Sequence, residues 1–547
     1  MTNHVNMKFF TVLFLLPFSL FSQNNTNHQD TLRGCINSER SWWNLLRYEL
    51  SVKPDYNSKT IKGENRIYFE MTEKFDFMQI DLQSPMNIDS VIFENKKIKY
   101  QREGNVFHLN FSEIVFQEKV QKISVYFSGK PREAINPPWD GGWIWKKDEK
   151  GRPWMSVACQ GLGASVWYPC KDHQSDEPEN GVSMTIISPD TLVAVSNGRI
   201  IDTKEYSKGF VATTWEVKNP INNYNVIPYI GKYVHWEENY KGEKGNLSCD
   251  YWVLDYELER AKVQFKQVPS MLKCFEHWFG PYPFYEDGYK LVQSPYLGME
   301  HQSAVAYGNN FQNGYLGRDL SGSGWGKKWD YILVHESGHE WFGNNITTND
   351  IADMWVHEGF TTYSETIYTS CLYGVEAGNE YQNGLRSSIR NDRPIIGQYS
   401  VNKEGSGDMY SKGSNLIHMI RQLMDDDEKF RQLLRGLNET FWHKTVTTGE
   451  IENFINNTSG INYSKIFDQY LRTIQIPKLE YKIENDNENV LCRWTDCVAG
   501  FDMKIRLTDG KWISPTEEWN KLPIKLEKKE VLLVDPNFYI KVKKINN

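Results

Sequence analysis

The stretch VHESGHEWFGN, residues 334–344, decides how the rest of the chain is interpreted. On a helix, positions i and i+4 lie on one face one turn apart, so the imidazoles of His335 and His339 can point at one metal ion. Zinc accepts histidine nitrogen, and a catalytic zinc site takes three protein ligands and leaves a fourth position for water. The motif therefore predicts a helix over 327–345 that carries two zinc ligands.

A third ligand and a general base are also present in the sequence. Glu358 stands in DMWVHEGFTTYSE, at the start of a second helix predicted over 354–373, and two helices joined by a loop would bring it opposite the histidine pair. Glu336 lies about 100° round the helix from His335, poorly placed to bind the same metal but able to accept a proton from water. The alternative for Glu336 is an ordinary solvated glutamate. His357 and His418 are interpreted as structural residues rather than ligands.

A lone carboxylate precedes this motif. In LGMEHQSAVAYG, residues 297–308, Glu300 lies among small and apolar residues, with no Lys or Arg within ten residues downstream. A charge in such a setting usually needs a cationic partner, which the local sequence does not supply. Glu300 is therefore either a turn residue that faces water or a group whose partner comes from outside the chain.

Four segments in one order resemble a known family. VHESGHEWFGN followed by DMWVHEGF resembles the gluzincin aminopeptidases of the aminopeptidase N and leukotriene-hydrolase family. LGMEH resembles the family motif G-x-M-E-N, WYPCKDHQSDEP resembles its F-P-C-x-D-E-P segment, and MYSKGSNLIHMIR resembles the segment with its catalytic tyrosine. The resemblance covers about residues 45–475, and four ordered motifs are far more specific than any one of them.

The resemblance implies a role for each matching residue. It makes zinc the cofactor, one ion per chain, and Glu336 the base, and it makes Glu300 the group that binds the free α-amine of the substrate. Tyr410 resembles the phenol that stabilises the oxyanion, and Gln160 a residue near the amine and the first side-chain pocket. The implied zinc ligands are His335, His339 and Glu358, and the implied substrate-lining strand is Gly298 and Met299.

The sequence departs from the family pattern at two places, both in motifs that the resemblance assigns to substrate binding. His301 stands where the family usually has Asn, and CKDHQSDEP carries an insertion relative to C-x-D-E-P. Neither touches the metal motif, so they bear on specificity rather than on hydrolysis.

The chain divides into three predicted domains. Short alternating segments such as RYELSVKP and VQKISVYFSG predict an antiparallel β domain over 40–235. Helical spacing from about Glu237 predicts a catalytic domain over 236–476, with further helices over 410–424, 427–437 and 448–457. Strand patterns return in a small β domain over 477–547. With the family resemblance, the expected fold is α+β and multidomain: an N-terminal β saddle, a thermolysin-like helical catalytic domain and a C-terminal β module.

Net charge, the N-terminal segment and the cysteines indicate where the protein is located in the cell and which partners are not expected. The chain has 547 residues and a net charge of −8 without long blocks of one sign, so no nucleic-acid surface is expected. Lys8 and the apolar run that follows predict a signal peptide over 1–23 and an exported protein, periplasmic or extracellular, with no membrane-spanning segment after its removal. The eight cysteines do not form a disulfide framework, although Cys492/Cys497 or Cys159/Cys170 are candidates for pairing.

The expected function is that of a zinc aminopeptidase, which removes N-terminal residues from peptides with a free N-terminus. In this interpretation the cation that Glu300 lacks is the ammonium of the substrate. Two alternatives stay open: a zinc endopeptidase or epoxide-type hydrolase on the same scaffold, and a non-catalytic binding scaffold. The complete ligand set and base count against the scaffold, and Glu300 counts against the endopeptidase.

Overall fold

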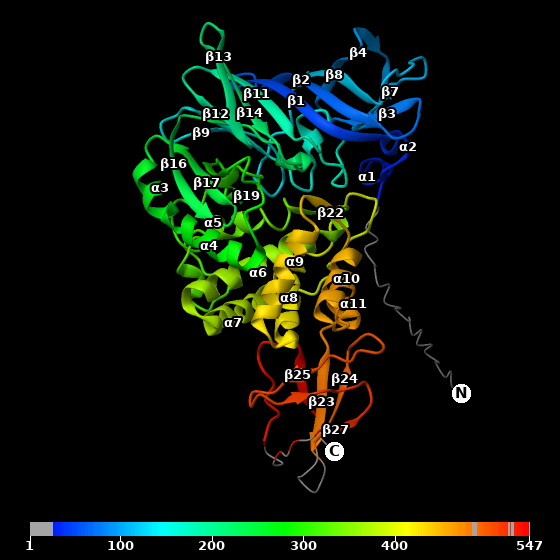
Figure 1. Ribbon diagram of the computed structural model, residues 1–547, viewed down its shortest axis with the longest axis vertical. Helices are drawn as coiled ribbons and strands as arrows, with labels where there is room; N and C mark the ends of the chain where they lie inside the picture. Colours follow the sequence, from blue (N-terminus) through cyan, green and yellow to red (C-terminus); the bar gives the residue numbers. More distant parts are fainter. Residues whose placement is uncertain (1–25, 484–489, 523, 525, 527–529, 546–547) are drawn as a thin grey trace, which may run out of the picture.

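The computed structural model describes residues 26–483, 490–522, 524, 526 and 530–545. The predicted signal peptide, residues 1–23, lies outside these residues. An N-terminal β region, a central helical region and a small C-terminal β region follow one another along the chain and along the long axis of the molecule (Figure 1). The predicted fold class is confirmed, whereas the domain boundaries at 40–235, 236–476 and 477–547 stay predictions.

The N-terminal region is built on an eight-stranded sheet. Its strands alternate buried and exposed side chains, as β8 does over Val120–Gly129, so one face packs on the core and the other meets water. All neighbouring strands of this sheet are antiparallel, as predicted, except for one pair: β1 and β11 run parallel. In sheet order the strands are β13 (Arg199–Ser207), β14 (Phe210–Val217), β11 (Val182–Pro189), β1 (Trp43–Asp55), β2 (Thr60–Met71), β8, β4 (Asn87–Phe93) and β5 (Lys96–Ile98).

Two smaller sheets complete this region and share its hydrophobic core. One sheet has the order β12 (Val193–Val195), β15 (Tyr229–Gly231), β10 (Pro153–Ala158) and β9 (Gly142–Lys147), and the other has β3 (Phe77–Asp81), β7 (Val106–Asn110) and β6 (Tyr100–Glu103).

A five-stranded sheet joins the β region to the helices. The sequence predicted that strands give way to helices near Glu237, but strands continue to Leu254. Alternate side chains of the last of these strands, β17, pack into the core of the helical region. In β18 neighbouring residues face different cores: Leu291 packs with the helical region and Val292 with the N-terminal region. In order, the strands are β16 (Tyr233–Gly242), β17 (Gly245–Leu254), β18 (Tyr289–Gln293), β20 (Val305–Tyr307) and β19 (Gly298–Met299).

The helices predicted over 354–373, 410–424, 427–437 and 448–457 are present with ends that differ by up to three residues, whereas the helices His28–Gly34, Ser38–Ser41, Val375–Gly384 and Ser464–Arg472 were not predicted individually. The helix predicted over 327–345 is shorter, because α5 begins after the N-cap Asp330 and its last helical residue is Gly338. His339 follows as the C-cap with right-handed helical backbone angles, so it still lies one turn after His335. The helices are α1 (His28–Gly34), α2 (Ser38–Ser41), α3 (Leu258–Gln264), α4 (Val268–Phe279), α5 (Tyr331–Gly338), α6 (Trp355–Tyr373), α7 (Val375–Gly384), α8 (Ser411–Met424), α9 (Asp427–Thr440), α10 (Thr448–Ser459) and α11 (Ser464–Arg472).

The described residues of the C-terminal β region do not form a separate hydrophobic core. Its buried side chains, such as Tyr481, Trp494 and Phe538, belong to the cluster that fills the helical region. The strands of its main sheet are β27 (Asn520–Leu522), β24 (Val490–Thr495), β23 (Lys478–Ile483) and β28 (Lys541–Lys544), and a separate pair is β25 (Ile505–Arg506) with β26 (Trp512–Ile513). The shared core fixes this region against the helices.

One disulfide joins Cys274 of α4 to Cys371 of α6. The candidate pairs Cys492/Cys497 and Cys159/Cys170 are wrong, because all four of these thiols are free. The true pair is 97 residues apart and brought together by helix packing, which sequence spacing does not reveal. Among the described residues, no helix has both the length and the apolar character that a membrane crossing needs.

Helix α6 meets its neighbours at glycines. A Cβ on Gly338 of α5 would lie 2.5 Å from Ser364 Oγ of α6. On the other side of α6, a Cβ on Gly413 of α8 would lie 3.2 Å from the Cα of Gly359. Both crossings therefore bring backbones closer than most side chains permit, and they set the positions of the residues at the ends of α5 and α8 relative to α6.

We expect Gly413→Ala to push α8 away from α6. Overpacking of this kind costs about 1–3 kcal/mol, so the midpoint of thermal unfolding should fall. Gly449→Ala in α10 is the matched control, because the nearest atom to its added Cβ is 4.0 Å away and alanine favours a helix. An unfolding midpoint of Gly413→Ala equal to that of Gly449→Ala would contradict the assigned packing.

Candidate metal centre and substrate cleft

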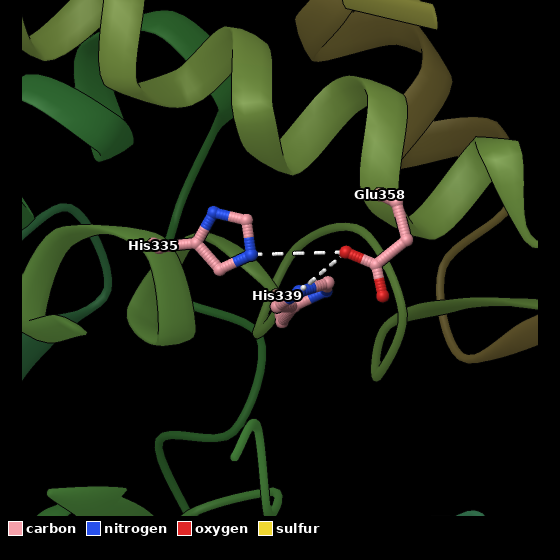
Figure 2. Close-up of side chains that lie close together, drawn as sticks. All are labelled: His335, His339 and Glu358. Carbon is pink, nitrogen blue, oxygen red and sulfur yellow. Dashed lines mark ion pairs between the residues drawn. The ribbon is translucent and has the colours of Figure 1, made fainter. Parts of the chain in front are cut away.

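The three predicted zinc ligands meet where α5 faces α6. Glu358 Oε2 lies 3.7 Å from His335 Nε2 and 3.4 Å from His339 Nε2, as Figure 2 shows. One donor atom from each residue falls within 4.8 Å of the other two, and all three side chains are buried. The predicted ligand set therefore converges in space.

The donor set fits zinc. Glu358 Oε2 is buried without a hydrogen-bond partner in the described part of the chain, which is costly for a carboxylate oxygen unless a cation binds it. Burial raises the pKa of Glu358, but His339 and His335 outweigh it and bring the pKa well below its ordinary value, so Glu358 is ionised. Two imidazole nitrogens, one carboxylate oxygen and an open side toward a cleft are what a catalytic zinc site requires.

Further contacts orient the two histidines. His335 Nδ1 lies 2.6 Å from Glu365 Oε1, and Tyr381 donates a hydrogen bond of 2.5 Å to the other oxygen of Glu365. Burial lowers the pKa of His335, whereas the carboxylates of Glu358 and Glu365 raise it above its ordinary value, and a more basic imidazole is a stronger ligand.

His339 is held by the turn that follows it, because its Nδ1 lies 2.9 Å from the carbonyl oxygen of Phe342.

Sequence reasoning missed Glu365, the residue that supports His335. Its position seven residues after Glu358, two turns along the same face of α6, was the available signal.

Glu336 occupies the same cleft but is not one of the three converging ligands. Burial raises its pKa to about 7, with Glu300 and Glu358 adding to the shift. A Cβ on Gly298 would lie 2.6 Å from Glu336 Oε1, so the edge strand β19 passes directly beside this carboxylate. A group with a pKa near neutrality beside a free strand edge is suited to accept and return a proton.

Glu300 is buried, and its side-chain contacts come from the N-terminal region. Gln160 donates a hydrogen bond of 2.5 Å to Glu300 Oε1, and Tyr224 donates one of 2.9 Å to the same oxygen. Burial raises the pKa of Glu300, with Glu358 adding to the shift. The alternative of a turn glutamate facing water is wrong, because Glu300 is only 2% exposed. Tyr224 was missed, because nothing local in the sequence connects it to a site 76 residues away.

Tyr410 borders the cleft at the N-cap of α8. Its ring stacks on that of His335 with 6.1 Å between centroids and 20° between planes. The cleft contains every predicted site residue: Gln160, Gly298, Met299, Glu300, His335, Glu336, His339, Glu358 and Tyr410. Trp139, Tyr315, Tyr331 and Glu404 also line it and were not predicted from sequence. The structure thus brings all the candidates together, and their individual roles stay predictions.

The two departures from the family pattern lie behind the cleft wall rather than in it. His301 is fully buried, its Nδ1 lies 2.6 Å from the hydroxyl of Tyr229, and burial lowers its pKa to about 3. In the inserted segment, Lys171 pairs with Asp176, and Gln174 donates to Thr348 Oγ1 at 3.2 Å. Both features pack the N-terminal region against the catalytic region.

Two family models match the chain in the same order as its regions. The peptidase M1 N-terminal domain matches residues 45–224, and the peptidase family M1 domain matches residues 263–470. The chain belongs to peptidase family M1. The M1 match includes the three zinc ligands, Glu300, Glu336 and Tyr410, so zinc is the expected cofactor of this donor set.

M1 relatives with assigned names are distant and longer. The chain is 20% identical to "Aminopeptidase 2" of Candida albicans, over 79% of this chain and 47% of that protein. It is 25% identical to "Leukotriene A-4 hydrolase" of Xenopus laevis, over 57% of this chain and 51% of that protein. The chain spans about half the length of the curated relatives it matches.

Solved M1 structures share the fold. A mutant M1 zinc metallopeptidase from Deinococcus radiodurans, bound to a Tyr-Ser-Ala substrate, superposes with a TM-score of 0.67 at 18% identity. The match covers 79% of this chain and 95% of that one. At this identity the likeness shows the M1 fold alone.

We expect Glu365→Gln to weaken zinc binding by about 10- to 100-fold, because the amide removes the charge that makes His335 basic. Competition with a chelator of known affinity, read as zinc content, measures the effect. Glu376→Gln, an exposed substitution on the neighbouring helix α7, is the control. Unchanged zinc affinity in Glu365→Gln would show that Glu365 does not support the ligand.

Proposed function

We propose that the protein is a zinc-dependent aminopeptidase. The observation that carries the proposal is the short distance between Glu300, which would bind the substrate amine, and the predicted zinc ligands. Glu300, Glu336 and His339 place donor atoms within 4.8 Å of one another, and His339 also belongs to the triad with His335 and Glu358. An ammonium group held by Glu300 would therefore sit about one residue from the reacting bond, which limits cleavage to the first peptide bond.

The environment of Glu300 favours a cationic ligand. Among the residues that line the cleft there is no Lys or Arg, while four carboxylates face it: Glu300, Glu336, Glu358 and Glu404. The two hydrogen bonds that Glu300 receives come from the neutral groups of Gln160 and Tyr224. Its negative charge is therefore uncompensated within the cleft lining, and a peptide N-terminus would supply the missing charge.

The chain offers a group for each remaining task. The edge strand β19, Gly298–Met299, pairs with β20 on one side only, so its other side is free for an extended peptide. Zinc, when bound, supplies Lewis-acid chemistry that activates water near neutral pH. Glu336 accepts the proton of the attacking water and passes it to the leaving amine. The hydroxyl of Tyr410 donates to the carbonyl oxygen as negative charge develops there.

The runner-up is another hydrolase on the same centre. The likeness to a protein named leukotriene A-4 hydrolase keeps an epoxide substrate in view, because the zinc ligands and Glu336 alone do not distinguish the two reactions. Glu300 distinguishes an endopeptidase from the proposal, since cleavage of an internal peptide bond does not require a buried amine-binding carboxylate.

Glu336→Gln and Tyr410→Phe test the catalytic assignments. Glu336→Gln should retain zinc but lose about 10²- to 10⁴-fold in turnover, because only the proton acceptor is removed. Tyr410→Phe should lower kcat by about 10²–10³ with little change in KM. Steady-state kinetics on an aminoacyl fluorophore together with zinc analysis separates these results. Near wild-type turnover in Glu336→Gln, or an effect of Tyr410→Phe confined to KM, would reject the respective role.

Glu300 provides the decisive test of the proposal. We expect peptides with an acetylated N-terminus to be very poor substrates, because acetylation removes the charge and leaves Glu300 buried without a partner. Glu300→Ala should lose about 2–5 kcal/mol in kcat/KM toward free peptides and should narrow the gap between free and acetylated ones. Equal cleavage of blocked and free peptides by the wild type would establish an endopeptidase instead.

We further propose that the protein is exported to the periplasm or the cell exterior. Two features support this: the basic and apolar pattern of residues 1–23, and the Cys274–Cys371 disulfide, a bond typical of oxidising compartments. Mass spectrometry of protein from the native host should find a mature chain that begins near Asn24 and carries this disulfide. An intact N-terminus with both thiols reduced would place the protein in the cytoplasm.

A further inference from the structure

Two cavities meet beside the catalytic centre. The cavity that contains the zinc ligands and a second, neighbouring cavity share three lining residues: Trp139, Gln160 and Glu404. Gln160 also donates to Glu300, so this junction lies next to the group assigned to the substrate amine. On the proposed function, which this inference extends, a side chain attached to the first residue of a peptide reaches this junction.

Glu404 is a carboxylate without a function in the site described so far. It makes no hydrogen bond or ion pair with any residue in the described ranges, although it is half-buried. Its Oε1 lies 3.1 Å from the point that a Cβ on Gly161 would occupy, so it rests against the segment that carries Gln160. Burial raises the pKa of Glu404 to about 7, with Glu358 and Glu300 adding to the shift and Arg393 opposing it.

Trp139 presents an aromatic ring to the same junction. Its side chain is 64% exposed, and its loop is braced by Asp140, whose carboxylate accepts the backbone N–H of Ile135 at 2.6 Å and of Asn136 at 3.0 Å. An exposed tryptophan on a braced loop gives a flat surface that packs well on an alkyl stem and attracts a cation over its face. Trp139 and Glu404 therefore combine the two features that recognise a long cationic side chain.

The charges of the cleft favour a cationic side chain of the substrate over an acidic one. Once Glu358 binds zinc and Glu300 binds the substrate ammonium, the carboxylate of Glu404 still has no ion-pair partner in the described ranges, and the charge that acts to lower its pKa is that of Arg393 in the outer cavity. Arg132, Arg393 and Lys403 line only the outer cavity, and Lys403 pairs with Asp30 at 3.4 Å. A negative side chain at the junction would be repelled by Glu404, which lines both cavities.

We propose that Glu404 and Trp139 form the pocket for the first side chain of the substrate and select peptides that begin with Arg or Lys. Glu404 pairs with the cationic end group, and the ring of Trp139 covers the alkyl stem. Both are assigned as specificity residues, not as members of the hydrolytic machinery.

The test compares arginyl and citrullyl fluorophore substrates, which have the same shape and α-amine and differ in the charge of the side chain. The wild-type holoenzyme should show a kcat/KM ratio of about ten or more in favour of arginine. Glu404→Gln should reduce that ratio at least about fivefold, and Trp139→Ala should lower kcat/KM for both substrates. Glu237→Gln, exposed on β16, is the control and should keep the wild-type ratio.

The pH dependence gives a second readout. Glu404 is neutral below its pKa and negative above it, so the arginine-to-citrulline ratio should rise between about pH 6 and about pH 8 in the wild type and stay flat in Glu404→Gln. Because the two substrates share the same α-amine, titration of that amine and of Glu336 cancels in the ratio. A flat wild-type ratio, or an unchanged ratio in Glu404→Gln, overturns the proposal.

Failure of this inference is distinguishable from failure of the proposed function. Zinc-dependent cleavage of leucyl or glutamyl substrates at a higher kcat/KM than arginyl substrates would overturn the selection of basic residues and leave the aminopeptidase intact. No cleavage of any free aminoacyl substrate by zinc-loaded protein would overturn both.

Discussion

The close crossing of α5 and α6 is the constraint on which the site depends. Gly338 leaves no Cβ between the helices, so the turn from His335 to His339 lies directly against Glu358. With larger residues at the crossing, the helices would separate and the three donors could no longer share one ion. The same helix α6 carries Glu365 to His335, which means that one rigid element supplies both a ligand and the support of another.

Buried negative charge is the second consequence of this packing. The carboxylates of Glu300, Glu336 and Glu358 lie close together, so that Glu358 helps to raise the pKa values of the other two, and burial opposes the charged form of each. Such a cluster is costly in a folded protein unless cations enter it. On the proposed function, the metal and the substrate amine would supply the positive charge that the cleft needs, because the chain itself supplies only neutral donors and histidines there.

Local sequence patterns predicted those site residues that lie within one or two helical turns of one another or at the start of the next helix. The spacing of His335 and His339 is a property of a single helix, and the position of Glu358 follows from the start of the next one. Contacts across the chain were not predictable in this way. Tyr224 reaches Glu300 through packing between distant segments, and Cys274 meets Cys371 only because α4 packs on α6. The strands from Tyr233 to Leu254 were missed because helical spacing begins soon after them.

The shared five-stranded sheet explains why the proposed amine-binding site draws on both large regions. Leu291 of β18 packs in the helical core and Val292 in the N-terminal core, so the sheet that ends in β19 is held from both faces. Glu300 follows β19 directly and receives its hydrogen bonds from Gln160 and Tyr224 of the N-terminal region. The metal ligands, by contrast, all come from α5, its C-cap and α6. Changes in the packing of the β region should therefore disturb Glu300, the proposed amine-binding residue, before they disturb the three zinc ligands.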